Sequence, residues 1–164
     1  MANHSEHLNQ AVKNIDFLEK VNTNIPESWD WQVTISFYSA LHLANAHIAH
    51  TINQHYRTHG KVSEALNAYL AVNPSMFNEE AYLSYLALQG LSRRSRYLCS
   101  DKDDPISKAD IRVHFTSEKH LAKALRHLNN IQKFFSLTYK YEFSPIYIGC
   151  SKLKEDSLEY ISCK

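Results

Sequence analysis

Histidine is the residue type whose spacing in this sequence first suggests chemistry. Five of the ten histidines lie close together: His42, His47, His50, His55 and His59. Neighbours in this set are three to five residues apart, and the i,i+3 and i,i+4 pairs place two imidazoles on one side of a helix. A zinc or iron centre needs a third or fourth ligand, and the Glu-x-x-His repeats of a di-metal bundle are absent. The sequence therefore predicts structural or solvated histidines, with no metal and no cofactor.

Arginine and tyrosine form the second group, in the sequence LSRRSRYL at residues 91–98. Arg93 and Arg96 are three residues apart and, with Tyr97, form a surface suited to a phosphate and a base. Cations in the last turns of a helix also gain about 0.3 to 1 kcal/mol from the helix dipole without any ligand. Both interpretations stay open. The nearest other cations in the sequence are Arg57, His59 and Lys61.

Other catalytic patterns are absent. The three glycines are scattered singly, so the chain has no glycine-rich phosphate loop, and no spacing supports a Cys–His pair or a nucleophile elbow. Asp30 stands between two tryptophans, and a helix N-cap explains it with the fewest assumptions. If the protein is an enzyme, the candidate catalytic residues are His42, His59 and Arg96.

The composition limits the class of protein. The 164 residues are 44% hydrophobic with 3 Gly and 4 Pro, which indicates one soluble helical domain and argues against an all-β fold. The net charge of +1 means that nucleic acid would need a local patch, although the histidines could add roughly five charges near pH 6.5. Three cysteines that fit no metal knuckle, and no apolar run of about 20 residues, predict a cytoplasmic protein that does not contact membranes.

Hydrophobic periodicity predicts two long helices in the first third of the chain. The first covers about residues 5–21, and the second, central helix covers about residues 29–55. The predicted core stripe of the central helix is Trp31, Ile35, Tyr38, Leu41, Ile48 and Ile52. His59-Gly60 is interpreted as the stop that follows this helix, because glycine is common just past a helix end.

Three further helices complete an all-α fold. A short helix is expected over residues 63–72, Asn78 caps a fourth helix to about residue 98, and Thr116 or Ser117 opens the last one. Residues 100–110 are expected to form a loop. The sequence thus predicts an antiparallel bundle of about five helices over residues 1–138. Residues 139–164 are expected to be an irregular extension, packed on the bundle or partly disordered, with one short strand and a frayed terminus.

Four short motifs carry a family resemblance through their order and spacing. They are DW at 30–31, FYSALH at 37–42, the histidine at 59, and the S-x-x-x-R-Y of Ser92, Arg96 and Tyr97. Together they resemble the bacterial HEPN-domain proteins, over about residues 8–135. Members of that family are bundles of four or five helices, often dimeric. Many are RNases or bind RNA or nucleotides in toxin–antitoxin, phage-defence and stress systems.

One feature of the family is missing. Its catalytic members carry an arginine followed after four to six residues by a histidine, and no arginine here has a histidine at that distance. The resemblance therefore implies a non-catalytic homodimer that binds RNA, a nucleotide or a protein partner. Two alternatives stay open: a divergent metal-independent RNase with rearranged His and Arg residues, and a scaffold that acts only through protein contacts. The expected ligand-binding residues are Arg57, His59, Arg93, Arg96 and Tyr97.

Overall fold

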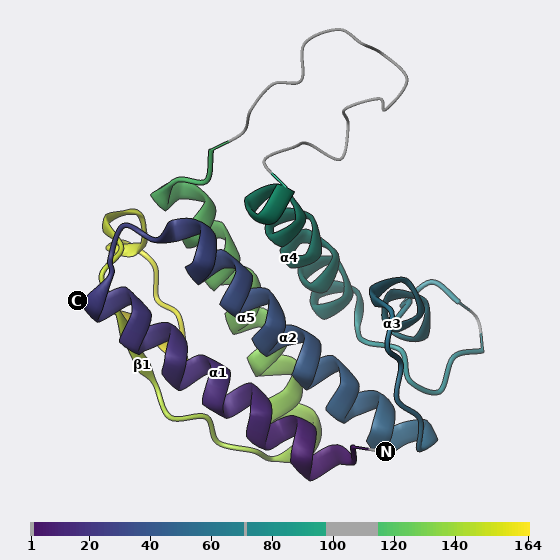
Figure 1. Ribbon diagram of the computed structural model, residues 1–164. Helices are drawn as coiled ribbons and strands as arrows, with labels where there is room; N and C mark the ends of the chain where they lie inside the picture. The colour runs from purple at the N-terminus through teal and green to yellow at the C-terminus, as the bar shows by residue number, and fades with distance from the viewer. Residues whose placement is uncertain (1, 71, 98–114) are drawn as a thin grey trace, which may run out of the picture.

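The computed structural model describes residues 2–70, 72–97 and 115–164 (Figure 1). Within them the chain is mostly helical, which confirms the predicted all-α bundle. The elements in order are α1 (His4–Asn24), α2 (Trp29–Ile52), α3 (His59–Ala65), α4 (Glu79–Tyr97), α5 (Glu118–Tyr139), β1 (Ile146–Ile148), the 3-10 turn η1 (Ser151–Leu153) and β2 (Ile161–Cys163). The loop expected at residues 100–110 lies outside the described residues.

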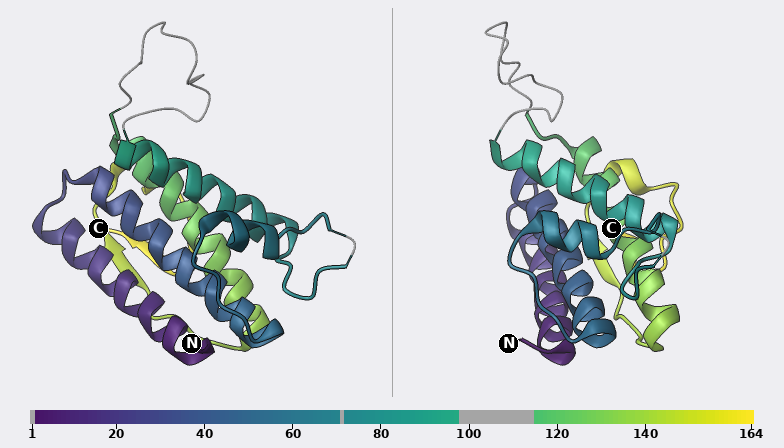
Figure 2. Two further views of the ribbon diagram at one scale, coloured as in Figure 1. Left: turned by 45° about the vertical axis from the view of Figure 1, so that its right-hand side comes forward. Right: turned by 90° about the vertical axis from the view of Figure 1, so that its right-hand side faces the viewer.

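Helix α2 is the central element of the bundle. It packs against α1, α4 and α5, while α3 lies beside the start of α4. The helices α1 and α2 run in opposite directions, as do α4 and α5, and the two turned views in Figure 2 show the same arrangement. Within the described residues, no helix combines the length and the hydropathy that crossing a bilayer requires.

The predicted core stripe of α2 is confirmed at Ile48, which is buried, and it is wrong at Trp31. Its other members, Ile35, Tyr38, Leu41 and Ile52, are partly buried against the core. Trp31 is 64% exposed and Tyr38 only half-buried, whereas Val33, Phe37 and Ala40 are fully buried. Alanine and serine fill much of the buried surface, so three neighbouring helices can approach α2 closely. Because small residues mark the contact faces, the large apolar residues alone did not indicate the buried side.

The expected helix stop at His59-Gly60 is also wrong. Helix α2 ends at Ile52, and Asn53 takes the left-handed conformation with φ of 50° that glycine usually takes at such a position. His59 and Gly60 instead form the first turn of α3, which is shorter and earlier than the expected 63–72 helix.

The predicted starts of the last two long helices are confirmed. Ser117 directly precedes α5, and the Asn78 side chain accepts a hydrogen bond from the Ala81 backbone N–H at 2.9 Å in the first turn of α4. This bond satisfies one of the donors that a helix N-terminus leaves without an intrahelical partner.

Loss of this cap gives a first testable result. Replacing Asn78 with alanine is expected to lower the free energy of unfolding by about 1 kcal/mol, measured by urea denaturation. The matched control is Ser28→Ala, because Ser28 precedes α2 but its side chain makes no capping bond. Equal losses in the two variants would contradict a capping role for Asn78.

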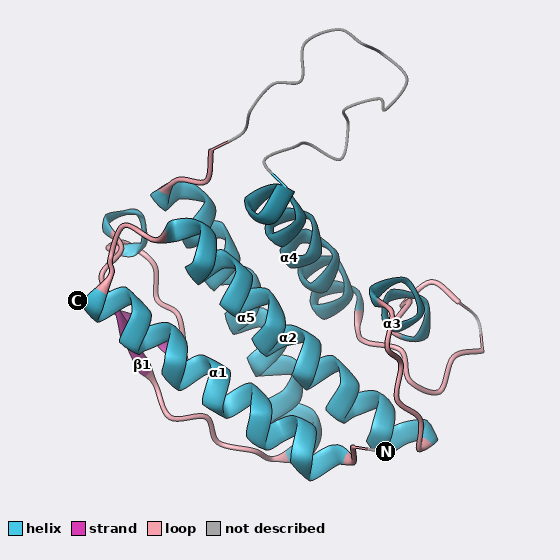
Figure 3. Cartoon of the chain, viewed as in Figure 1, coloured by secondary structure: helices cyan, strands magenta, loops and turns pink. Residues whose placement is uncertain are grey.

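The C-terminal extension is ordered and packs on the bundle. β1 and β2 pair in parallel, with Ile146 opposite Ile161, behind α1 in the view of Figure 3. The side chains of Ile146 and Ile148 are buried, and the Lys164 backbone N–H donates to the Ile148 carbonyl at 3.1 Å. The expectation of one strand and a frayed terminus is therefore wrong, because the last residues form the second strand.

Candidate functional site

Arg96 lies between two tyrosine rings at the end of α4. Its guanidinium carbon is 5.3 Å from the centroid of the Tyr97 ring and 6.0 Å from that of Tyr38 on α2. Both distances are in the range of cation–π attraction. The Arg96 Nε also donates to the Ser92 carbonyl at 3.3 Å, one turn back along α4. The side chain is thus held at the surface, next to a Tyr97 ring that is 66% exposed.

His59 packs against the same part of α2. Its ring meets those of Phe37 and Tyr38 edge to face, with centroids 5.1 and 6.4 Å apart. Burial lowers the pKa of His59, and the positive charge of Arg96 lowers it further. The structure therefore brings together His59 and Arg96, with a histidine that remains neutral at pH 7.

A cavity of about 160 Å³ adjoins Arg96, between the start of α2 and the end of α4. Its lining residues are Asp30, Trp31, Thr34, Ser95 and Arg96.

The exposed position of Trp31 differs from the core position that the sequence predicts. Two residues two positions apart on a helix point to nearly opposite sides, so Trp29 and Trp31 could not both be buried on one face, and this spacing was an available signal.

We call Trp31, Tyr38, His59, Arg96 and Tyr97 the α2–α4 surface. It combines three aromatic rings, one fixed cation and one neutral imidazole, contributed by the starts of α2 and α3 and the end of α4. Such a surface can stack flat rings and bind a phosphate through the guanidinium.

The other predicted ligand-binding residues lie around this surface. Arg93 is exposed on α4, four residues before Tyr97 and hence on the same side of the helix. Arg57 is exposed in the loop before α3. A larger cavity of about 370 Å³ beside α3 includes Lys61 and Tyr56 but none of the predicted ligand-binding residues.

His42 does not share the α2–α4 surface with Arg96. Its Nδ1 lies 3.1 Å from the Nδ1 of His7 on α1, and their ring centroids are 5.4 Å apart. His42 follows Tyr38 by one helical turn, but its ring contacts belong to a separate group of histidines. The ring contacts of His42 are thus with His7 on α1, and the catalytic role of His42, His59 and Arg96 stays a prediction.

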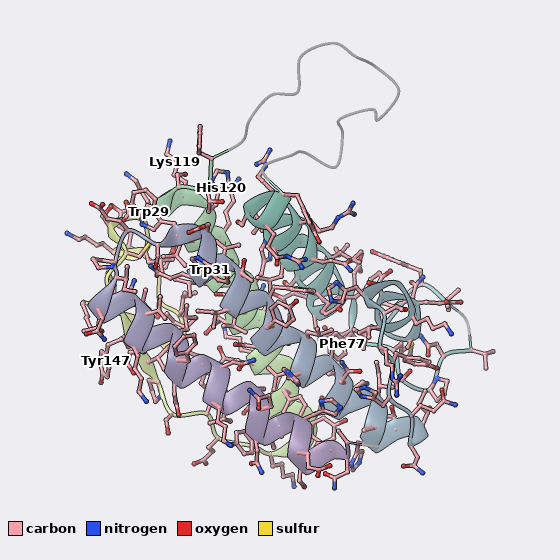
Figure 4. All side chains as sticks on the ribbon, viewed as in Figure 1. Trp29, Trp31, Phe77, Lys119, His120 and Tyr147 are labelled. Carbon is pink, nitrogen blue, oxygen red and sulfur yellow. The ribbon has the colours of Figure 1, made fainter. Side chains whose placement is uncertain are left out.

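A second arginine–histidine pair was missed by sequence reasoning. Arg94 Nη1 lies 3.3 Å from Nε2 of His120 on α5, and His120 Nδ1 lies 2.9 Å from the Ser117 hydroxyl oxygen. The Ser117 backbone N–H donates to His120 Nδ1 at 3.0 Å, so Nδ1 is an acceptor and the proton of the neutral ring lies on Nε2, the nitrogen that faces Arg94. Figure 4 shows His120 and Lys119 at the end of the bundle that also holds Trp31. The pair is far apart in sequence, so no local spacing could indicate it.

The charge expected from histidine protonation is smaller than the composition suggested. Burial is the largest cause of a lowered pKa at five histidines, namely His7, His42, His47, His59 and His127. These five stay mostly neutral at pH 6.5, so acidification to that pH adds fewer charges than the ten histidines would add if all were exposed. No group of three or more His, Cys, Asp or Glu in the described ranges is arranged to hold a metal ion.

Comparison with known proteins adds no relative. The chain matches no protein-family model, no curated protein and no solved structure. Function is therefore inferred from the geometry and chemistry of the α2–α4 surface.

Proposed function

We propose that the protein is HEPN-like and binds RNA or a nucleotide through the α2–α4 surface, without cleaving it. We place it in the bacterial cytoplasm, as a homodimeric component of a defence or toxin–antitoxin system that could also engage a protein partner. The observation that carries the proposal is the guanidinium of Arg96, held between Tyr38 and Tyr97 beside a cavity that includes Trp31.

Single-stranded RNA fits this chemistry better than a duplex. Stacking of a base on an aromatic ring contributes about 1 to 3 kcal/mol, and Trp31 and Tyr97 both expose most of their surface. A guanidinium can bind a phosphate through two parallel hydrogen bonds, which an ammonium cannot do. The net charge of +1 predicts modest affinity that falls as salt rises.

The proposal is tested by titrating the protein with a short single-stranded RNA while following tryptophan fluorescence. Arg96→Ala is expected to weaken binding by about tenfold, which corresponds to about 1.4 kcal/mol. Trp31→Phe should keep binding, because the smaller phenyl ring can still stack on a base. The fluorescence change should be smaller, because the indole of Trp31 is removed. The matched control is Arg126→Ala. Arg126 is not part of the α2–α4 surface, and its Nη2 forms an ion pair with Asp156 Oδ2 at a distance of 2.7 Å. Equal affinity of the wild type and Arg96→Ala would refute the proposal.

A divergent metal-independent RNase is the second candidate function. It is favoured by the pairing of His59 with Arg96, because a neutral histidine can act as a general base while an arginine stabilises the phosphorane-like transition state. Incubating the protein with total RNA in the presence of EDTA separates the two functions. Cleavage that is lost in both His59→Ala and Arg96→Ala would support the enzyme; intact RNA together with retained binding supports the first proposal.

A further inference from the structure

Three histidines from three segments form a continuous row of ring contacts outside the α2–α4 surface. His42 Nδ1 on α2 lies 3.1 Å from His7 Nδ1 on α1, and His7 Nε2 lies 2.9 Å from His55 Nδ1 in the loop between α2 and α3. The rings of His7 and His55 are stacked, with centroids 5.0 Å apart and planes 13° apart. We call His42, His7 and His55 the histidine chain.

His7 is the middle member and is almost fully buried, with 4% of its surface exposed. It directs its two ring nitrogens to two different partners, so the three imidazoles do not converge on one point as metal ligands would. The contacts are N–H···N hydrogen bonds, which require a donor on one ring and a lone pair on the other.

The number of protons that the histidine chain can hold follows from this requirement. Three neutral imidazoles carry three N–H groups and can make both bonds with the donors running in one direction. One added proton is also accommodated, since a doubly protonated His7 ring donates to both His42 and His55. A second added proton sets two N–H groups against each other in one of the gaps. That gap then has no hydrogen bond, and two of the three neighbouring rings carry a positive charge.

The surroundings of the histidine chain disfavour this second proton. The pKa of His7 is lowered to about 4, mainly by burial and in addition by His42 and His55, while Glu6 on α1 acts in the opposite direction. Burial and His55 also lower the pKa of His42. Glu6 from α1, His42 from α2 and His55 from the loop are the charged or titratable groups that act on His7.

We propose that the histidine chain is a pH-sensitive contact that holds the loop of residues 53–58 against α1 and α2 and releases the loop on acidification. The loop leads directly into His59, which packs on Phe37 and Tyr38. Release therefore loosens one side of the α2–α4 surface at low pH. The contact itself does not depend on RNA being the ligand of that surface.

The test uses ¹⁵N-labelled full-length protein and ¹H–¹⁵N NMR spectra recorded from pH 7.5 down to pH 4. In the wild type, the amide signals of residues 53–58 are expected to shift together, with a transition steeper than the titration of a single group. His7→Gln and His55→Gln each keep a neutral donor and acceptor in the chain but remove one imidazole. In both variants the shift of the loop amides is expected to be largely lost.

The matched control is His50→Gln, which removes an exposed histidine of α2 that is not in the histidine chain. It should leave the loop transition unchanged. The proposal is overturned if His7→Gln and His55→Gln both show the wild-type transition, or if the loop signals move only together with the signals of the whole bundle. The RNA titration at pH 7.5 is a separate measurement, so failure of the proposed function would leave this result unaffected.

Discussion

Replacement of Phe37 with alanine is expected to lower the free energy of unfolding by about 3 to 5 kcal/mol. Phe37 is fully buried at the centre of the bundle, and its ring contacts those of Tyr85, Tyr38 and His59. The substitution removes the apolar surface of the ring and leaves a cavity that close-packed helices fill only in part. Urea denaturation at pH 7.5, monitored by circular dichroism, gives the change.

The matched control for this prediction is Phe17→Ala on α1. Phe17 is 54% exposed, so the same substitution should change the free energy of unfolding by no more than about 0.5 kcal/mol. Similar losses in the two variants would contradict the central position of Phe37 in the core. Since His59 rests on Phe37, the Phe37→Ala variant should also weaken RNA binding where it remains folded.

Acidification is expected to destabilise the protein through His47. Burial lowers the pKa of His47 to about 4, against 6.5 in the unfolded chain, although backbone groups of Ser75 and Met76 oppose the shift. The ring lies among Phe77, Phe134 and Tyr139, and its Nδ1 is 2.7 Å from the Tyr139 hydroxyl. The folded state therefore favours the neutral imidazole.

The direction of the pH dependence follows from proton binding. Below pH 6.5 His47 is protonated in the unfolded chain, whereas in the folded protein it stays neutral down to about pH 4. The free energy of unfolding therefore falls as the pH falls from 6.5 to about 4. The contribution of His47 is roughly 3 kcal/mol, which follows from its pKa of about 4 in the folded protein and 6.5 in the unfolded chain. It is fully present above pH 6.5.

Urea denaturation of the wild type and His47→Gln at pH 7.5 and pH 4.5 measures this contribution. The wild type should lose more stability between the two pH values than His47→Gln, which has no titrating ring at this position. His50→Gln should keep most of the wild-type loss, because the charge of His50 is only a minor cause of the lowered His47 pKa. An equal loss in the wild type and His47→Gln would exclude His47 as a source of acid sensitivity.

Elements with a local signal could be predicted from the sequence. Asn78 and Ser117 are capping residues followed by an apolar helical period, and the helices begin where these residues predict. The end of α2 could not be predicted from Gly60, because Asn53 serves as the left-handed residue and the loop after it is held by contacts between distant histidines. The pairing of β1 with β2 could not be predicted for the same reason, because it depends on contacts between residues that are distant in the sequence, such as Ile146 and Ile161.

The candidate site was only partly visible in the sequence for the same reason. Arg96 and Tyr97 are adjacent in the sequence, so their grouping needed no tertiary information. His59 was grouped with them because of the order of the motifs that resemble the HEPN-domain proteins. The position of Trp31 required knowledge of which side of α2 is buried. The pairing of Arg94 with His120 required the packing of α4 on α5, which no spacing within one segment can encode.

The central position of α2 has a consequence for how the molecule comes apart. Because α2 contacts three long helices, it cannot detach without exposing the core residues of all of them, so these four helices should open as one cooperative unit. The short α3 packs mainly against α2 and α4, through few residues, and can open locally while that unit stays intact. Movement near His59 is thus thermodynamically inexpensive, whereas the frame that carries Trp31 and Arg96 stays rigid.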